Sequence, residues 1–326
     1  MAKTGGRQVS IGLGIESTAG TAVAETIFLP YTAFSVQTVA EKELFNSARG
    51  IRNMASNSMI KRKYSQGSMS VIPNVVNAPY FFGLALGTVA SSSIVDSGYT
   101  HTITAQNNNA SMKTATLTIE EGTIQTAQYT NIVCDSLNLE VSDGYASMTM
   151  DVIGQFATTD TMSKAYTEET EFAYHQMTIK FGTSVANATS GSATPIKSFS
   201  LNIANNVQLD EAFLSGSNEI TSGGLVAGAM QITGAYSLHF ENTTELAKYK
   251  ANTKNAAVIQ FLGAAFGTSN QEQIRIELAK LVLTSPPVEY NVDGLLILNQ
   301  EFEVEYGATD TDIKVVVVNE VAGTNY

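Results

Sequence analysis

The chain has 326 residues and a formal net charge of −12, with 18 basic against 30 acidic side chains. Apolar residues make up 44% of the sequence and charged residues only 15%, so the chain can bury a sizeable core while uncharged polar groups cover its surface. The acidic balance argues against a protein that holds nucleic acid by neutralising phosphates, and the single cysteine excludes an intrachain disulfide.

The sequence carries no sign of export or of a membrane span. Its first residues, MAKTGGRQVS, contain no apolar segment of signal-peptide length, and no apolar run approaches the ~18 residues of a transmembrane helix. We therefore expect a protein that is kept in a cytoplasm and has no membrane partner. Because few charges would lose water at an interface, the composition favours an assembly protein.

Short runs in which apolar and polar residues alternate recur along the chain. Such alternation puts one face of a strand in a core and the other in water, so these runs predict an all-β fold. Turn residues such as Ser142-Asp143-Gly144 separate neighbouring runs. In chain order the predicted strands are residues 67–71, 114–119, 136–141, 147–152, 177–181, 235–240, 257–262, 274–283 and 302–306.

Two stretches predict short helices. Residues 77–87 begin with Asn77 as an N-cap and end with a glycine. Residues 241–252 have Asn242 as an N-cap and Glu245 three positions on, close to a capping box. Each stretch follows a predicted strand that has a glycine at its start or just before it, Gly67 and Gly234.

The order of these elements repeats after about half the chain. Residues 34–37, FSVQ, resemble residues 199–202, FSLN. In the last strand of each half, residues 148–152 correspond to residues 302–306, an offset of 154. An alternative that stays open is that all-β chains look alike under so coarse a pattern.

The simplest interpretation is two tandem copies of one small β-domain, residues 1–160 and residues 161–326. The long loops of the two copies differ in charge. Residues 46–66 carry five of the 18 basic side chains, whereas residues 211–229 carry none. Loops of this length are usually functional or mobile. The five basic residues are Arg49, Arg52, Lys61, Arg62 and Lys63.

No motif for catalysis or cofactor binding occurs. Gly12-Leu13-Gly14 lacks the third glycine of a dinucleotide fingerprint, and no βαβ unit follows it. The histidines, His101, His175 and His239, are far apart and lack zinc-ligand spacing. Cys134 lies in an apolar run and is expected to be an unreactive core residue. We expect no enzyme activity, no metal and no cofactor.

Three carboxylates alternate with apolar residues along the last predicted strand. Glu301, Glu303 and Glu305 therefore share one strand face, while the other face packs. An ordinary solvated sheet face is one interpretation of this pattern. A metal site is not favoured, because no coordination loop lies nearby.

Several segments together match one known family. Residues 16–24 read ESTAGTAVA, and Leu29-Pro30-Tyr31 leads into the first strand. Further segments are GLALGT at 83–88, GYTHTI at 98–103, SFSLNIANNVQ at 198–208 and EFEVEYGA at 301–308. They are spread over nearly the whole chain, and together they resemble the tail tube proteins of long-tailed, non-contractile bacteriophages.

The resemblance implies a structural protein of the virion tail, assembled in the host cytoplasm. Tail tube domains are small β-sandwich or barrel units with one helix and one long loop or hairpin. Six such domains close into a ring, their inner sheets form a barrel around a channel, and rings stack into a tube through which the genome passes. Two domains per chain then imply three chains per ring, with six chains as the alternative. Tape-measure and tail-terminator proteins are the other implied partners.

The resemblance also suggests roles for the two charged sets. The five basic loop residues are expected to dock on an acidic surface of a neighbouring ring, where complementary charge fixes register. The three carboxylates Glu301, Glu303 and Glu305 are expected to line the channel and let DNA pass without specific binding. A basic wall would instead hold the genome by releasing counterions.

Two other interpretations stay open. The chain could be another tail protein on the same fold, such as a terminator, decoration or baseplate protein. A ligand-binding β-module or adhesin is less favoured, because aromatic platforms usually involve tryptophan and this sequence has none.

Overall fold

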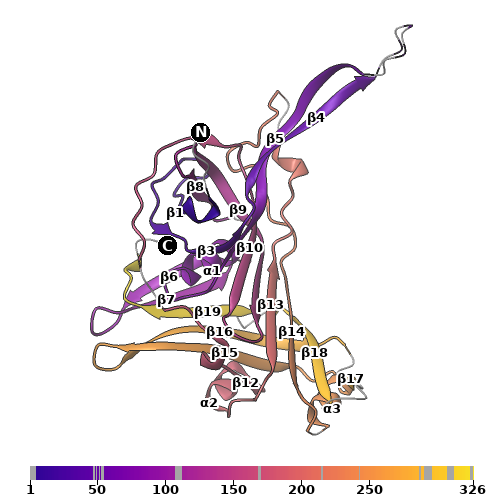
Figure 1. Ribbon diagram of the computed structural model, residues 1–326. Coiled ribbons are helices and arrows are strands. Elements are labelled where there is room, and N and C mark those ends of the chain that lie inside the picture. Colours follow the sequence, from indigo (N-terminus) through magenta and orange to yellow (C-terminus); the bar gives the residue numbers. More distant parts are fainter. Residues whose placement is uncertain are drawn as a thin grey trace.

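A sheet of long antiparallel strands runs through the molecule, and one hairpin projects from it (Figure 1). The computed structural model describes residues 5–46, 48, 50, 52, 55–106, 112–167, 170–213, 216–241, 243–285, 288–289, 296–306, 312–323 and 326.

The predicted all-β fold is confirmed, and both predicted helices are present. The helices are α1 (Ala78–Leu86), α2 (Val185–Ser190) and α3 (Thr244–Lys250). The strands are β1 (Val9–Ile15), β2 (Ile27–Phe28), β3 (Tyr31–Phe34), β4 (Gln37–Asn46), β5 (Ala55–Val71), β6 (Gly87–Ser93), β7 (Tyr99–Ala105), β8 (Ala115–Glu121), β9 (Thr126–Val141), β10 (Ser147–Gly154), β11 (Thr158–Thr159), β12 (Met177–Gly182), β13 (Ser198–Ala204), β14 (Gln231–His239), β15 (Asn255–Phe266), β16 (Asn270–Leu283), β17 (Val288–Glu289), β18 (Ile297–Val304) and β19 (Ile313–Asn319).

The caps differ from the sequence-based expectation. Asn77 makes no side-chain hydrogen bond to the first turn of α1. The second predicted cap, Asn242, lies outside the described residues. Helix α2 was not predicted, and it is capped by Ser184, whose Oγ accepts a hydrogen bond from the Asn187 N–H at 3.3 Å.

One sheet, called here the long sheet, runs through both halves of the chain. Its strand order is β3 (continued by β4), β5, β10, the second part of β9, β13, β14, β18, and finally the end of β16 with β17. These strands lie side by side in Figure 1, with the first half joined to the second where β9 pairs with β13.

Two smaller sheets back the long sheet. The first backing sheet has the order β2, β1, β8, the first part of β9, and β11. The second has the order β12, β15, β16, β19, β7 and β6. One apolar cluster joins residues of all three sheets with α1, every residue of which is buried. The core therefore lies between the long sheet and its two backing sheets.

The same strand order occurs in each half. The order β3, β5, β10, β9 recurs in the long sheet as β13, β14, β18, β16. The order β1, β8, β9, β11 recurs in the backing sheets as β12, β15, β16, β19. Strands β6 and β7 have no counterpart among the described strands of the second half, and they extend its backing sheet through β19.

The pairing corrects one register predicted from the sequence. Gly67 lies opposite Val152, and Gly234 lies opposite Phe302. If the two glycines are equivalent, Val152 takes the position of Phe302, so the predicted offset of 154 between the last strands is wrong by four residues. Four is an even number, and a shift of four keeps the same residues on the same face of the strand.

The two glycines have a common physical reason. A Cβ on Gly67 would lie 2.5 Å from the carbonyl oxygen of Ser35, and a Cβ on Gly234 would lie 2.3 Å from that of Ser200. Backbone atoms cannot yield to such contacts as a flexible side chain could. At both positions the neighbouring strand approaches too closely for any residue but glycine.

The region predicted as a long loop at residues 46–66 is largely a hairpin. Strands β4 and β5 pair from Gln37 and Gln66 outward to Asn46 and Ala55, and they form the projection in Figure 1. The sequence gives no alternation here because β4 is exposed on both faces over most of its length. A strand without a buried face leaves no period-two pattern.

Candidate functional site

The face of the long sheet that points away from the core is polar and carries few charges. In most of these strands the apolar residues are buried and the residues between them are more accessible, as in β9, where Leu137 and Leu139 alternate with Asn138 and Glu140. This open face is formed by Ser68, Ser70, Ser136, Asn138, Glu140, Ser147, Thr149, Asp151, Ser198, Ser200, Asn202, Ala204, Thr233, Ala235, Ser237, Asn299, Glu301 and Glu303.

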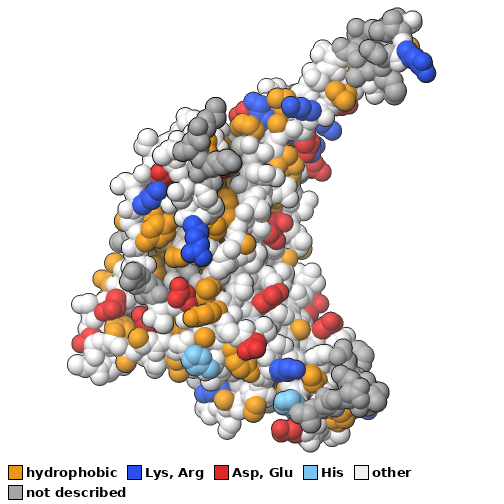
Figure 2. Space-filling model, in the orientation of Figure 1, with side chains coloured by type: hydrophobic (Ala, Val, Ile, Leu, Met, Phe, Trp, Pro, Cys, Tyr) orange, Lys and Arg blue, Asp and Glu red, His pale blue; other side chains and the backbone are white. Residues whose placement is uncertain are grey.

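No open-face position in this set is lysine or arginine, and four are carboxylates. Several polar side chains satisfy one another across strands. Ser136 donates to Asp151 at 2.7 Å, and Gln231 donates to Glu303 at 3.1 Å. Asp151 and Glu303 thus accept hydrogen bonds from neutral groups. The surface over β10, β13 and β14 is mostly white with scattered red in Figure 2.

The three predicted channel carboxylates fall into two groups. Glu301 and Glu303 lie on the open face, opposite Ala235 and Thr233 of β14. Glu305 follows the end of β18 and is ion-paired with Lys254, so its charge is compensated. Sequence reasoning did not single out Glu140 and Asp151, which occupy the same face in the first half. The alternation of residues 136–141 and 147–152 was the signal that could have found them.

The predicted basic residues also divide. Arg62 pairs with Asp210 at 2.5 Å, and Lys63 pairs with Glu219 at 3.0 Å. Both acidic partners belong to residues 205–230, the second half's long loop, so these charges are already paired within the chain. Arg52 and Lys61 are exposed, and Arg49 lies outside the described residues. Figure 2 shows basic side chains around the base and the tip of the projecting hairpin.

The 205–230 loop packs on the first half through apolar as well as charged contacts. Tyr64 and Ile153 of the first half form a small buried cluster with Ile220 and Leu225 of the loop. The Arg62 guanidinium lies 5.1 Å from the ring centre of Phe213. The loop therefore braces the base of the hairpin at the place where the two halves of the long sheet join.

The long sheet has two open edges. Strands β3 and β4 pair with β5 on one side and with no other strand in the described part of the chain. At the far end, β17 pairs with β18 and with no further described strand. Open edges present unpaired backbone N–H and C=O groups, which bind another strand readily.

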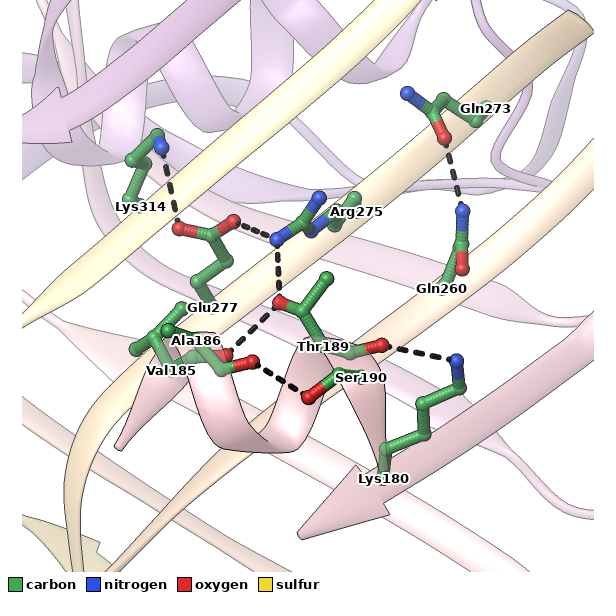
Figure 3. Close-up of polar contacts among 10 residues, drawn as sticks. All are labelled: Lys180, Val185, Ala186, Thr189, Ser190, Gln260, Gln273, Arg275, Glu277 and Lys314. Carbon is green, nitrogen blue, oxygen red and sulfur yellow. Dashed lines mark hydrogen bonds and ion pairs between the residues drawn. The ribbon is translucent and has the colours of Figure 1, made fainter. Parts of the chain in front are cut away.

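An ion cluster around the buried Glu277 lies on the second backing sheet, away from the open face. Figure 3 shows Glu277 between Arg275 and Lys314, at 2.5 Å and 3.2 Å. Arg275 also donates to the Thr189 hydroxyl of α2 at 2.8 Å. These contacts attach the short polar helix α2 to the sheet, which gives the cluster a structural role.

Cys134 and His101, whose side-chain types often act in catalysis, are both buried. Burial raises the pKa of the Cys134 thiol, aided by the charges of Asp135 and Asp151, so the reactive thiolate is disfavoured. His101 is buried between Ser91 and Asn319, at 2.8 Å and 2.9 Å, and burial lowers its pKa. Within the described residues, no group of three His, Cys, Asp or Glu side chains could hold a metal ion. No described helix is long and apolar enough to cross a membrane.

A family model for phage tail tube proteins matches residues 6–304. No curated protein matches the sequence. The family match extends over the projecting hairpin, the polar open face and both open edges of the long sheet. This chain belongs to the phage tail tube protein family.

Proposed function

We propose that this chain builds the tail tube of a long-tailed, non-contractile phage as rings of three two-domain chains. Family membership makes the chain a structural component of the virion tail that assembles with itself into a tube. On our proposal it assembles in the host cytoplasm, has no catalytic role, surrounds the tape-measure protein and ends at a terminator protein. A ring of six chains is the alternative.

The observation that carries the proposal is one continuous long sheet with an open edge at each end, whose strands β10, β9, β13, β14 and β18 place no lysine or arginine on the open face. The repeated strand order supports two tandem domains, residues 1–160 and residues 161–326, that stand side by side in the ring. Each chain supplies eight strand positions in the described part of the long sheet. Three chains would give roughly 24 strands, and at ~4.8 Å spacing and ~40° tilt their barrel has a radius of about 24 Å.

The open face suits the wall of such a channel. Its carboxylates repel phosphates, and its hydroxyl and amide groups offer weak, short-lived contacts. The repulsion acts close to the wall, because the Debye length is about 8 Å at physiological salt. DNA would therefore stay near the axis and slide, with no counterion release to hold it.

Electron microscopy of the purified protein tests the proposal. Negative-stain images are expected to show rings and stacked tubes, and mass photometry of single rings is expected to give the mass of three chains. A ring mass of six chains would support the alternative stoichiometry. Monomers at every concentration would contradict tube building.

Of the basic residues Arg49, Arg52, Lys61, Arg62 and Lys63, the last two pair within the chain, so the projecting hairpin is proposed to contact the next ring through the others. Exchanging Arg52 and Lys61 for glutamate is expected to shorten tubes and make stacking more sensitive to salt, because both side chains are exposed and their positive charges would face an acidic neighbour. Tube lengths in electron micrographs at low and high salt measure the effect.

A matched control changes the same charge elsewhere. Lys250→Glu, at the exposed end of α3, should leave tube length unchanged. Arg62→Glu and Lys63→Glu test a different contact, since they break ion pairs within the chain and should loosen the 205–230 loop. Normal tubes at every salt concentration in the Arg52 and Lys61 variant would remove the docking role of those two residues.

A further inference from the structure

We infer that chains within a ring are joined by antiparallel pairing of the β3–β4 edge of one chain with the β17 edge of the next. The register is that of the β9–β13 pairing inside the chain, so Val36 lies opposite Val288, and Ser35 lies opposite Glu289. The partner is a second copy of this chain, and the inference rests on the proposed ring.

The template is the junction between the two halves of the long sheet. There Leu139 of β9 lies opposite Leu201 of β13, and Glu140 lies opposite Ser200. Just beyond the paired residues, the Asn205 N–H donates to the Asp135 carbonyl at 2.7 Å. The N–H and C=O groups of successive residues in a strand point to opposite sides. The odd-numbered residues of β13 therefore point these groups toward β9, as Asn205 does.

The β3–β4 edge repeats the geometry of β13. Phe34 lies opposite Met69 as Phe199 lies opposite Tyr236. The Ser35 N–H donates to the Ser68 carbonyl at 2.9 Å, so Ser35 turns its backbone groups toward β5. The backbone groups of Val36 consequently point outward, as those of Leu201 point toward β9.

The β17 edge repeats the geometry of β9. Val288 lies opposite Leu298, and Leu139 lies opposite Met148. Because Val152 takes the position of Phe302, Met148 takes that of Leu298, which makes Val288 the equivalent of Leu139. The next residue, Glu289, is then the equivalent of Glu140.

The faces of the sheet continue across the proposed junction. Val36 is 6% exposed and already faces the core side, whereas Ser35 is exposed. Pairing Ser35 with Glu289 gives a Ser–Glu pair at the register position that Ser200 and Glu140 occupy inside the chain. A slip of one residue would set Val36, which faces the core side, opposite position 289, the equivalent of the open-face residue Glu140, so the alternation selects this register.

Disulfide trapping tests the register. In assembled tubes of Ser35→Cys with Glu289→Cys, oxidation is expected to link most chains into multimers on a non-reducing gel, because directly opposed strand residues lie within disulfide reach. Two controls frame the result. Ser200→Cys with Glu140→Cys should close within single chains, and the slipped pair Ser35→Cys with Val288→Cys should give only traces of multimer. The native Cys134 is buried and does not interfere.

Hydrogen exchange on the unmodified protein gives an independent measure. The amides of Val36 and Val288 should exchange quickly in free subunits and slowly in tubes, whereas the Ser35 amide should be protected in both. Intact tubes with no cross-link at Ser35 and Glu289, stronger linkage in the slipped pair, or unprotected Val36 would overturn the register while leaving the tube function standing. Absence of tubes from the unmodified protein would instead contradict the proposed function itself.

Discussion

Replacing Glu140, Glu301 and Glu303 together with lysine is expected to lower phage infectivity by orders of magnitude while tubes still form. The three side chains lie on the open face, and lysines there would bind phosphates along the whole channel. Each lysine that contacts a phosphate steepens the slope of log binding constant against log salt concentration by about 1. Plaque titre measures the loss, and DNA left in the capsid after triggered ejection shows where it arises.

Two control substitutions distinguish the effect of positive charge on the open face from the effect of changing the side chains there. One places a neutral residue at the same positions, and the other places lysine elsewhere on the surface. Glutamine at the same three positions removes repulsion without adding attraction, so infectivity should fall far less than with lysine. Lysine at Glu320, which is exposed and follows β19 of the second backing sheet, should leave ejection unchanged. A normal titre with the triple lysine variant would mean that the open face does not meet the DNA.

Glu16→Ala is expected to destabilise the free subunit by about 3–5 kcal/mol, one of the largest single effects in the chain. The Glu16 carboxylate is 7% exposed. It accepts hydrogen bonds from the Gly20 N–H at 2.7 Å, the Thr114 and Thr116 hydroxyls at 2.7 Å and 2.9 Å, and the Asn131 N–H at 2.9 Å. Removing the acceptor leaves buried donors without partners, and urea unfolding measures the cost.

The structural reason is local. Glu16 ties the N-terminal segment to β8 and to β9 at Asn131, next to the point where β9 leaves the first backing sheet. Glu16→Gln retains one acceptor oxygen and should cost less than alanine. Glu121→Ala, near the end of β8, should change stability by no more than about 0.5 kcal/mol. Equal stability of the alanine variant and the parent would show that the carboxylate is not needed as a buried acceptor.

Much of the fold was predictable because most strands have one wet and one buried face. The runs at 136–141 and 147–152 are strands with the expected alternation. The β4–β5 hairpin was not predictable as strand, since a ribbon exposed on both faces loses that pattern. Helix α2 was not predictable from the sequence, because its six residues, VANATS, show no helical apolar periodicity.

The candidate site was predictable in kind and incomplete in detail. The alternation in the last strand correctly placed Glu301 and Glu303 on one face, but the pairing of Glu305 with Lys254 joins residues far apart in the sequence. The same holds for Arg62 with Asp210, which lie 148 positions apart. Such contacts depend on how the halves pack, and no local pattern records them. The junction between the halves is likewise a tertiary feature, visible only once β9 is seen to pair with β13.

Strand β9 belongs to two layers without a break. Its Ile132 pairs with Ala115 in the first backing sheet, and its Val133 pairs with Ile153 in the long sheet. If the long sheet lines the channel as we propose, widening the channel must also bend the first backing sheet, because both share the backbone of β9. On that proposal, the covalent continuity of β9 between the two sheets resists radial expansion of the tube, in addition to the packing of the sheets on each other.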